Sequence, residues 1–231
     1  PTNGLQNRHI ALWQSHGFYY EPKLNRWEWQ RARCLQTVED LYTQSFVLPY
    51  LVPMLENAGA NVLLPRERDC QTAEIIIDND GCLNTNSTYT EHTADKVWRQ
   101  GTGKGFAHLR PQYIDFENPF KEGTFRIAET VKKGKESTAE WIPEIPQNGQ
   151  YAVYVSYQTV PNSSDDALYT VYHKGGVSQF KVNQKMGGGT WVYLGTFGFD
   201  AGKSNACKVT LSNRSAKAGQ TVTADAVKIG G

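Results

Sequence analysis

The pattern of apolar and polar residues changes its rhythm near residue 73. Before this point, short apolar runs at 9–13 and 61–64 flank a longer segment with helical spacing. That segment places one set of apolar side chains near a single helical face: Val38, Leu41, Leu48, Leu51, Val52 and Leu55. The pattern predicts a strand, a helix and a second strand, an arrangement that normally forms a parallel strand pair with a right-handed crossover.

The predicted helix has recognisable boundary residues. Thr37 is a suitable N-cap, and Asp40 follows three residues later, as in a capping box. Pro49 and Pro53 each remove a backbone donor, so we expect a kink or break near them. Gly59 can adopt a positive φ and therefore predicts the end of the helix.

From residue 74 onward, short alternating segments are separated by Gly, Asn, Asp and Pro. The alternation predicts strands in the segments 74–78, 151–157, 167–173, 179–183, 190–197, 207–211 and 222–229. Many short strands at this spacing favour an antiparallel β-sandwich of jelly-roll type. The expected fold class is therefore α+β, with a partial β-α-β unit over 1–72 followed by a β-sandwich domain over 73–231.

Charge and hydropathy exclude several classes of partner. The 231 residues carry 24 basic and 23 acidic side chains, a net charge of +1, which does not predict binding to nucleic acid or to a membrane surface. No apolar run approaches the ~20 residues of a membrane-spanning helix. Pro1 is an unusual natural start, so we expect any export signal to have been removed.

The cysteines do not indicate a function. Cys34, Cys70, Cys82 and Cys207 form no CxxC pair, which argues against a zinc knuckle. Four cysteines allow three disulfide pairings, and the sequence does not choose among them. Cys70 and Cys82 are the nearest two in the chain.

Two residues could belong to a metal site. His16 precedes Gly17 at the end of the first predicted strand, and Glu39 lies in the first turn of the helix. A histidine and a carboxylate can share a zinc ion, but zinc catalysis normally needs three protein ligands. Asp40 is an alternative to Glu39, although a favourable interaction with the helix dipole explains Asp40 better.

The other histidines offer no convincing third ligand. His92 lies in a polar loop, His108 follows a Gly-rich turn and His173 ends a predicted strand. We expect all three to be ordinary surface or core histidines. The metal site predicted from the residues therefore consists of His16 and Glu39 alone.

Aromatic residues are abundant, with 12 Tyr, 9 Phe and 6 Trp. Most should be buried, because sandwich cores depend on large apolar side chains. Trp191 and Tyr193 share one strand face and are expected to be buried together. Trp98 and Phe106 flank a Gly-rich loop and are the better candidates for exposed, carbohydrate-binding rings.

The second region resembles the golvesin C-terminal-like domain, also described as a xanthan-lyase carbohydrate-binding-like domain. The resemblance covers about 74–230 and rests on these motifs: Trp141-Ile142-Pro143, Gly149-Gln150-Tyr151, Tyr154-Val155-Ser156-Tyr157, Tyr169-Thr170-Val171-Tyr172-His173, Val182-Asn183-Gln184, Trp191-Val192-Tyr193-Leu194-Gly195 and Thr223-Ala224-Asp225-Ala226-Val227. It implies a β-sandwich accessory domain of secreted bacterial carbohydrate-active and cell-wall proteins. The resemblance brings no catalytic residues with it.

The first region, about 8–70, resembles the opening of zinc-dependent N-acetylmuramoyl-L-alanine amidases. The matching motifs are His16-Gly17, Glu39, Gly59-Ala60-Asn61-Val62 and Arg66-Glu67-Arg68-Asp69. The resemblance implies that His16 and Glu39 are zinc ligands. Phe18-Tyr19-Tyr20 replaces the family's Gly-rich loop, and the His-to-Glu separation is longer than usual. The family's third ligand and catalytic Glu have no counterpart, which indicates an amidase-like domain interrupted by the sandwich.

Two functions follow as predictions. In the first, the chain is an inactive fragment of a secreted zinc amidase-like hydrolase, and its partners are polysaccharide or peptidoglycan and the remainder of the amidase-like domain. In the second, it is a non-catalytic carbohydrate-binding module of a xanthan-lyase-type protein. Both predict a secreted, periplasmic or cell-surface location. Neither involves nucleic acid or a membrane span.

Overall fold

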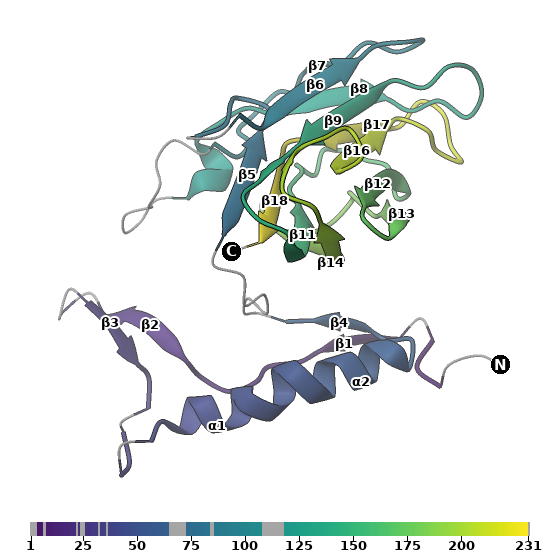
Figure 1. Cartoon of the computed structure of the whole chain (residues 1–231). Helices are drawn as coiled ribbons and strands as arrows, with labels where there is room; N and C mark the ends of the chain where they lie inside the picture. Colours follow the sequence, from purple (N-terminus) through teal and green to yellow (C-terminus); the bar gives the residue numbers. More distant parts are fainter. Residues whose placement is uncertain are drawn as a thin grey trace. The chain divides into compact units, whose positions relative to one another are not determined.

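A computed structural model describes residues 4–6, 8–21, 23, 26–31, 33–35, 37–64, 73–83, 86–107 and 118–230. The chain divides into two compact units, Pro1–Arg68 and Asp69–Gly231 (Figure 1). The predicted boundary after residue 72 falls at the edge of a segment, 65–72, that lies outside the described residues. Each unit is described by itself below. None of the helices in the described part of the chain has the length and apolar character needed to cross a bilayer.

Unit 1 contains a parallel strand pair joined through a helix. Strands β1 (His9–Ala11) and β4 (Asn61–Leu63) pair in parallel, with Ile10 opposite Val62. The intervening helical segment consists of α1 (Glu39–Phe46), η1 (Val47–Leu51) and α2 (Val52–Asn57). Between β1 and the helix, β2 (Phe18–Glu21) and β3 (Arg26–Trp29) form an antiparallel hairpin. The predicted parallel pair is therefore confirmed.

The helix begins differently from the prediction. Val38 is the N-cap and has no capping side chain, because the Thr37 hydroxyl instead donates to the Cys34 carbonyl oxygen at 2.7 Å. The expected break is present, since Pro49 lies in the π-helical segment η1. Gly59 follows the helix with a φ of 95°, the conformation predicted for it.

The core of unit 1 is small. Its buried residues are Val47, Val52, Ala60 and Val62, which pack with partly buried neighbours such as Ile10 and Leu55. The predicted apolar face of the helix is only partly covered: Leu41 is 49% and Leu51 37% exposed. Two short strands present too little surface to bury that whole face.

Unit 2 is an antiparallel β-sandwich. One sheet has the order β14-β11-β18-β5, built from Val192–Phe199, Gly149–Val155, Ala226–Gly230 and Glu74–Asp78. The other has the order β13-β12-β16-β9-β6, built from Gly176–Val182, Ala167–His173, Lys208–Ser212, Thr138–Ile142 and Thr88–His92. All pairings between these strands are antiparallel, as predicted.

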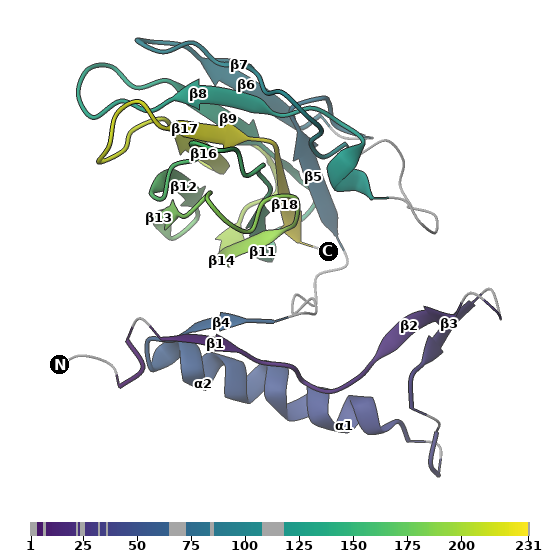
Figure 2. The ribbon, with the colours of Figure 1, turned by 180° about the vertical axis from the view of Figure 1, so that it is seen from behind.

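Smaller elements complete unit 2. A three-stranded sheet contains β17 (Thr221–Ala224), β8 (Arg126–Glu129) and β7 (Arg99–Gln100), which are seen from behind in Figure 2. Strands β10 (Glu144–Ile145) and β15 (Gly202–Lys203) form a short pair, and η2 (Pro119–Lys121) is a single 3-10 turn. Cys34, Cys82 and Cys207 carry free thiols, whereas Cys70 lies outside the described residues.

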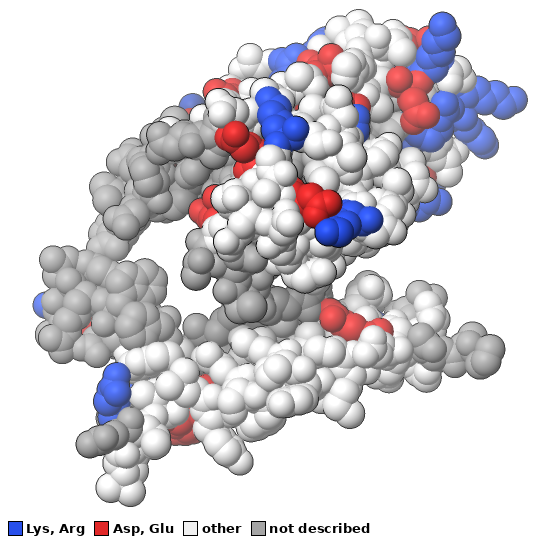
Figure 3. All heavy atoms as spheres, viewed as in Figure 1, with Lys and Arg blue, Asp and Glu red and all other residues white. Residues whose placement is uncertain are grey.

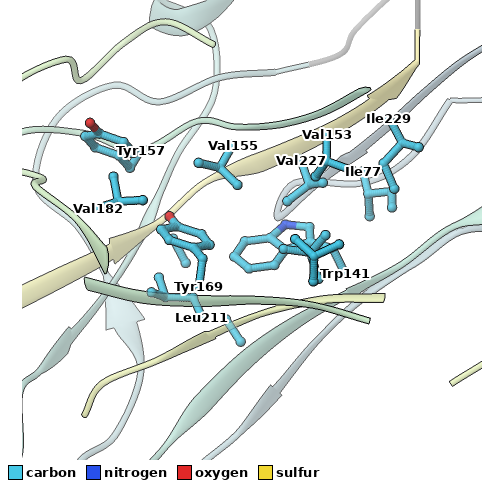
Figure 4. Packing of buried hydrophobic residues seen from close by; sticks show 14 of the residues in the cluster. Ile77, Trp141, Val153, Val155, Tyr157, Tyr169, Val182, Leu211, Val227 and Ile229 are labelled. Atoms are coloured by element: carbon cyan, nitrogen blue, oxygen red, sulfur yellow. The ribbon is translucent and has the colours of Figure 1, made fainter. Parts of the chain in front are cut away.

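The core of unit 2 lies between its two large sheets. Alternate residues of β11, such as Val153 and Val155, point inward toward Trp141 and Tyr169 of the opposite sheet (Figure 4). Figure 4 also shows Ile77, Val227 and Ile229 from β5 and β18 in the same layer. The alternation read from the sequence therefore indicates correctly which residues share a face of these strands.

Candidate functional site

The structure places Asp40, rather than Glu39, beside His16. His16 lies in the segment between β1 and β2, and its Nδ1 is 3.9 Å from Asp40 Oδ1. Asp40 is fully buried, whereas Glu39 is exposed. Neighbouring positions of an α-helix point about 100° apart, so only one of two consecutive acids can face the strand side. The preference for Glu39 over Asp40 therefore has no support from the geometry.

The surroundings of His16 and Asp40 are polar. Both carboxylate oxygens of Asp40 are buried and make no hydrogen bond to any described residue, and the same holds for the side-chain amide of Gln14. Arg31 Nε donates to His16 Nδ1 at 3.3 Å, and its Nη2 is 3.5 Å from His16 Nε2. Gln44 Nε2 donates to the His16 carbonyl oxygen at 3.4 Å.

These residues do not fit a zinc ion. His16 and Asp40 provide two donors, one fewer than a catalytic zinc normally has. The Arg31 guanidinium contacts both ring nitrogens of His16, so it places a positive charge where the metal would bind. Across the described ranges, no group of three or more His, Cys, Asp and Glu side chains has metal-binding spacing.

Two further histidines have structural partners in unit 2. His92 Nε2 is 3.7 Å from Glu140 Oε2, a carboxylate that also accepts from Lys208 at 2.9 Å. His173 Nε2 is 3.0 Å from Ser178 Oγ, and its Nδ1 accepts from the Gly175 backbone at 3.1 Å. His108 lies outside the described residues.

The exposure expected of Trp98 and Phe106 is wrong. Trp98 is 3% exposed and belongs to the core between the sheets. Phe106 is 1% exposed and packs with Ile76 and Ala226 in a second apolar cluster. The Gly-rich loop between them packs closely against the Phe125 ring, because Gly101 has no Cβ that would collide with this ring. The sugar-binding role predicted for both residues depended on an exposure that they do not have.

Trp191 and Tyr193 form a better aromatic surface. Both are partly exposed, contrary to the prediction that they are buried together. Tyr193 lies opposite Tyr154, and because Val153 and Val155 point into the core, Tyr154 and its partner lie on the outer face of the sheet. The Tyr154 and Tyr193 ring centroids are 5.3 Å apart. We call Trp191, Tyr193, Tyr154 and Lys228 the outer-face platform.

Packing holds the platform in place. The Trp191 ring lies 4.9 Å from Phe106 and 5.5 Å from Phe120, measured between ring centroids. Lys228 is opposite Tyr154 in the strand register, and its Nζ lies 4.5 Å from the centre of the Tyr154 ring. A cation at this distance from an aromatic face is stabilised by the ring. The platform therefore has two partly exposed rings, Trp191 and Tyr193, which are backed by the buried Tyr154 and Lys228 side chains.

Basic side chains also gather on unit 2, at the end where the β8–β9 and β16–β17 connections lie (Figure 3). Lys132, Lys133 and Lys135 are exposed in the first of these connections. Lys185 and Lys217 donate to Asp165 at 2.8 and 2.9 Å and lower the pKa of Asp165 to about 2. Solvent-exposed lysines of this kind add long-range attraction for anions without forming a defined site.

Comparison with known proteins concerns unit 2. Residues 119–231 match the family model of the Golvesin C-terminal domain. Xanthan lyase from Bacillus sp. (strain GL1) is 33% identical over 96 residues, which are 42% of this chain and 10% of that protein. These matches support a golvesin C-terminal-like domain in unit 2. Nothing in them supports an amidase-like unit 1.

Two solved structures show a partial similarity to this chain. A Paenibacillus xanthan lyase shares 25% identity at a TM-score of 0.49 and covers 68% of this chain. The C-terminal CBM6 domain of LamC from Zobellia galactanivorans shares 13% identity at a TM-score of 0.34, covering 69% of this chain and all of that domain. This chain spans only about a tenth of the curated lyase and 13% of the solved one.

Proposed function

We propose that unit 2 is a carbohydrate-binding module and that the outer-face platform is its ligand-contacting surface. The observation that carries the proposal is the partial exposure of two neighbouring aromatic residues, Tyr193 on the outer face of β14 and Trp191 directly before that strand. Rings held this way can stack on the apolar faces of sugar rings. The match to the Golvesin C-terminal domain and the similarity to a xanthan lyase support polysaccharide as the ligand class.

Binding to purified polysaccharides tests this function. The chain is titrated with xanthan and with laminarin, and binding is measured by calorimetry or affinity electrophoresis. We expect Trp191→Ala and Tyr193→Ala each to weaken binding about ten- to a hundredfold, the loss typical of a central aromatic contact. Trp13→Ala is the matched control, because Trp13 is 70% exposed and belongs to unit 1.

The outcomes separate the module from its proposed surface. Wild-type chain that is retained by no polysaccharide contradicts a carbohydrate-binding function. Wild-type binding that survives both platform substitutions refutes the platform as the contact surface. Loss of binding in Trp13→Ala would place the ligand on unit 1 instead.

The zinc amidase-like hydrolase stays a prediction for any longer protein that contains this chain. Its support in the structure is limited to the parallel β1–β4 pair, since His16 and Asp40 by themselves do not fit a zinc ion. Peptidoglycan cleavage by such a protein, measured with and without His16→Ala, would test it. The predicted secreted, periplasmic or cell-surface location likewise stays a prediction.

A further inference from the structure

Two buried carboxyl groups meet at one end of the β5–β18 strand pair. Asp78 ends β5, is 1% exposed and lies opposite Ala226 in the register, and Asp225 directly precedes β18 and is fully buried. Burial, followed by the negative charges of Asp225 and Asp80, raises the pKa of Asp78 to about 9. Burial also raises the pKa of Asp225, to about 7. The fold therefore holds these groups close together at a substantial electrostatic cost.

Several buried oxygen atoms around this pair lack a regular hydrogen bond. Asp78 Oδ1 and Asn79 Oδ1 are buried and make no hydrogen bond. The Asn79 amide nitrogen donates to Asp80 Oδ1 at 3.2 Å and to Thr124 Oγ1 at 3.0 Å, which fixes the orientation of the amide. Ser156 is fully buried, and its hydroxyl faces Asp225 without a hydrogen bond of regular geometry.

No side-chain cation compensates this charge within the described residues. None of their ion pairs includes Asp78, Asp80 or Asp225. The carboxylates are instead positioned by neutral donors. Both oxygens of Asp225 accept from the Phe106 backbone N–H at 3.1 Å, and Oδ2 also accepts from Gln158 Nε2 at 3.2 Å.

Asp80, which unlike Asp78 and Asp225 is exposed, is also held by neutral donors. Its Oδ1 accepts from the Thr124 hydroxyl and its Oδ2 from the Thr124 backbone N–H, both at 2.5 Å. Buried carboxylates that lack a counter-ion normally neutralise by protonation or coordinate a metal. Here the rigid support and the spare oxygen atoms favour the metal.

We propose that Asp78, Asn79, Ser156 and Asp225 form a calcium site. Asp80, which is held by hydrogen bonds from Thr124, contributes a further negative charge near the cation. Every available donor is an oxygen atom, and carboxylate, amide and hydroxyl oxygens are the ligands that hard divalent cations take. Calcium accepts six to eight oxygen ligands in flexible geometry, so backbone carbonyls or water complete the shell. Magnesium demands a tighter octahedral arrangement and binds less well here.

The site also connects to the rest of unit 2. Asp225 holds the Phe106 backbone, and the Phe106 ring packs against Trp191 of the outer-face platform. A cation at Asp225 would therefore stabilise the loop that supports Trp191. With two directly binding carboxylates, the expected dissociation constant is on the order of 10⁻⁵–10⁻³ M, the range of weaker calcium sites.

Calcium binding and thermal unfolding of the whole chain test the proposal. The protein is stripped with EDTA, and then CaCl₂ is titrated by calorimetry and the melting temperature is recorded with and without calcium. We expect a rise of about 5–10 °C at a calcium concentration one hundred times the dissociation constant. The same concentration of MgCl₂ gives a smaller rise.

Three variants make the test specific. Asp78→Asn and Asp225→Asn should lose both the binding heat and the temperature shift. In EDTA, Asp78→Asn should melt no lower than wild type, since it replaces a buried carboxyl group, costly to ionise, by a neutral amide of the same shape. Asp165→Asn is the control. Asp165 lies outside the proposed site, where it accepts hydrogen bonds from Lys185 and Lys217, so this variant should retain the full calcium shift.

Two results would overturn the proposal. Wild type that shows neither binding heat nor a temperature shift in CaCl₂ up to about 100 mM, one hundred times the highest expected dissociation constant, would mean that the two carboxyls neutralise by holding a proton instead. Calcium binding that persists unchanged in both Asp78→Asn and Asp225→Asn would place the cation elsewhere. Neither result depends on whether the chain binds polysaccharide.

Discussion

Gln184 offers a sharp test of how buried hydrogen bonds hold the sandwich together. Its side chain is fully buried in the segment after β13. Nε2 donates to the Thr223 carbonyl oxygen at 2.8 Å and to Tyr169 Oη at 3.2 Å, and Oε1 accepts from the Thr223 backbone N–H at 2.8 Å. The amide thus completes the hydrogen bonding of β17 on its free side.

Gln184→Met keeps the length and approximate volume of the side chain but removes all three hydrogen bonds. The substitution leaves the backbone N–H and carbonyl of Thr223 and the hydroxyl of Tyr169 buried without this partner. A buried group that loses its partner costs about 1–3 kcal/mol. We therefore expect the free energy of unfolding to fall by about 3–6 kcal/mol, a large part of the stability of an ordinary domain.

Urea unfolding followed by far-ultraviolet circular dichroism measures this loss, with the slope m checked for each variant. Gln179→Met is the matched control: Gln179 is an exposed residue of β13, so the change there should stay within about 0.5 kcal/mol. A Gln184→Met variant within 0.5 kcal/mol of wild type at unchanged m would refute the reasoning.

Other predictions concern the core, a tight contact and pH. Trp141 is fully buried between the sheets, so Trp141→Ala should cost about 3–5 kcal/mol in urea unfolding, and a loss below 1 kcal/mol would contradict that. A Cβ at Gly123 would lie 1.8 Å from the Phe106 carbonyl oxygen, so Gly123→Ala should lower the melting temperature by several degrees; an unchanged value argues against this contact. The raised pKa values of Asp78 (about 9) and Asp225 (about 7) mean that the folded state binds more protons than the unfolded state between pH ~4 and ~9. In EDTA, stability relative to Asp78→Asn should therefore fall as pH rises through this window, and urea titrations showing a rise would refute the assignment.

Much of the fold could be predicted because it follows from local patterns. The alternating run from Tyr151 to Val155 became strand β11, with Tyr151, Val153 and Val155 in the core. Apolar segments on either side of a helical stretch formed the parallel β1–β4 pair. These patterns are reliable because side chains of a strand alternate between faces whatever the tertiary context.

The errors arose where several partners compete for one group. Thr37 has the sequence context of an N-cap, yet its hydroxyl satisfies the Cys34 carbonyl, and the helix begins after Val38 instead. Glu39 and Asp40 are consecutive acids, and only the geometry of the helix against the first strand shows which one approaches His16. Sequence spacing gives the candidates in such cases, but three-dimensional contacts choose among them.

The sequence alone determined that this protein has a strand-helix-strand segment followed by an antiparallel β-sandwich, since both depend on short-range periodicity. It also predicted that Trp191 and Tyr193 point to the same side, although in the structure Trp191 directly precedes the strand. Tertiary structure decided that this face is the outer one and that Trp98 and Phe106 are covered. It also decided that Asp78 and Asp225 meet, because pairing of β5 with β18 joins segments from opposite ends of unit 2. Periodicity specifies which residues point together, whereas burial and charge proximity depend on what packs against them.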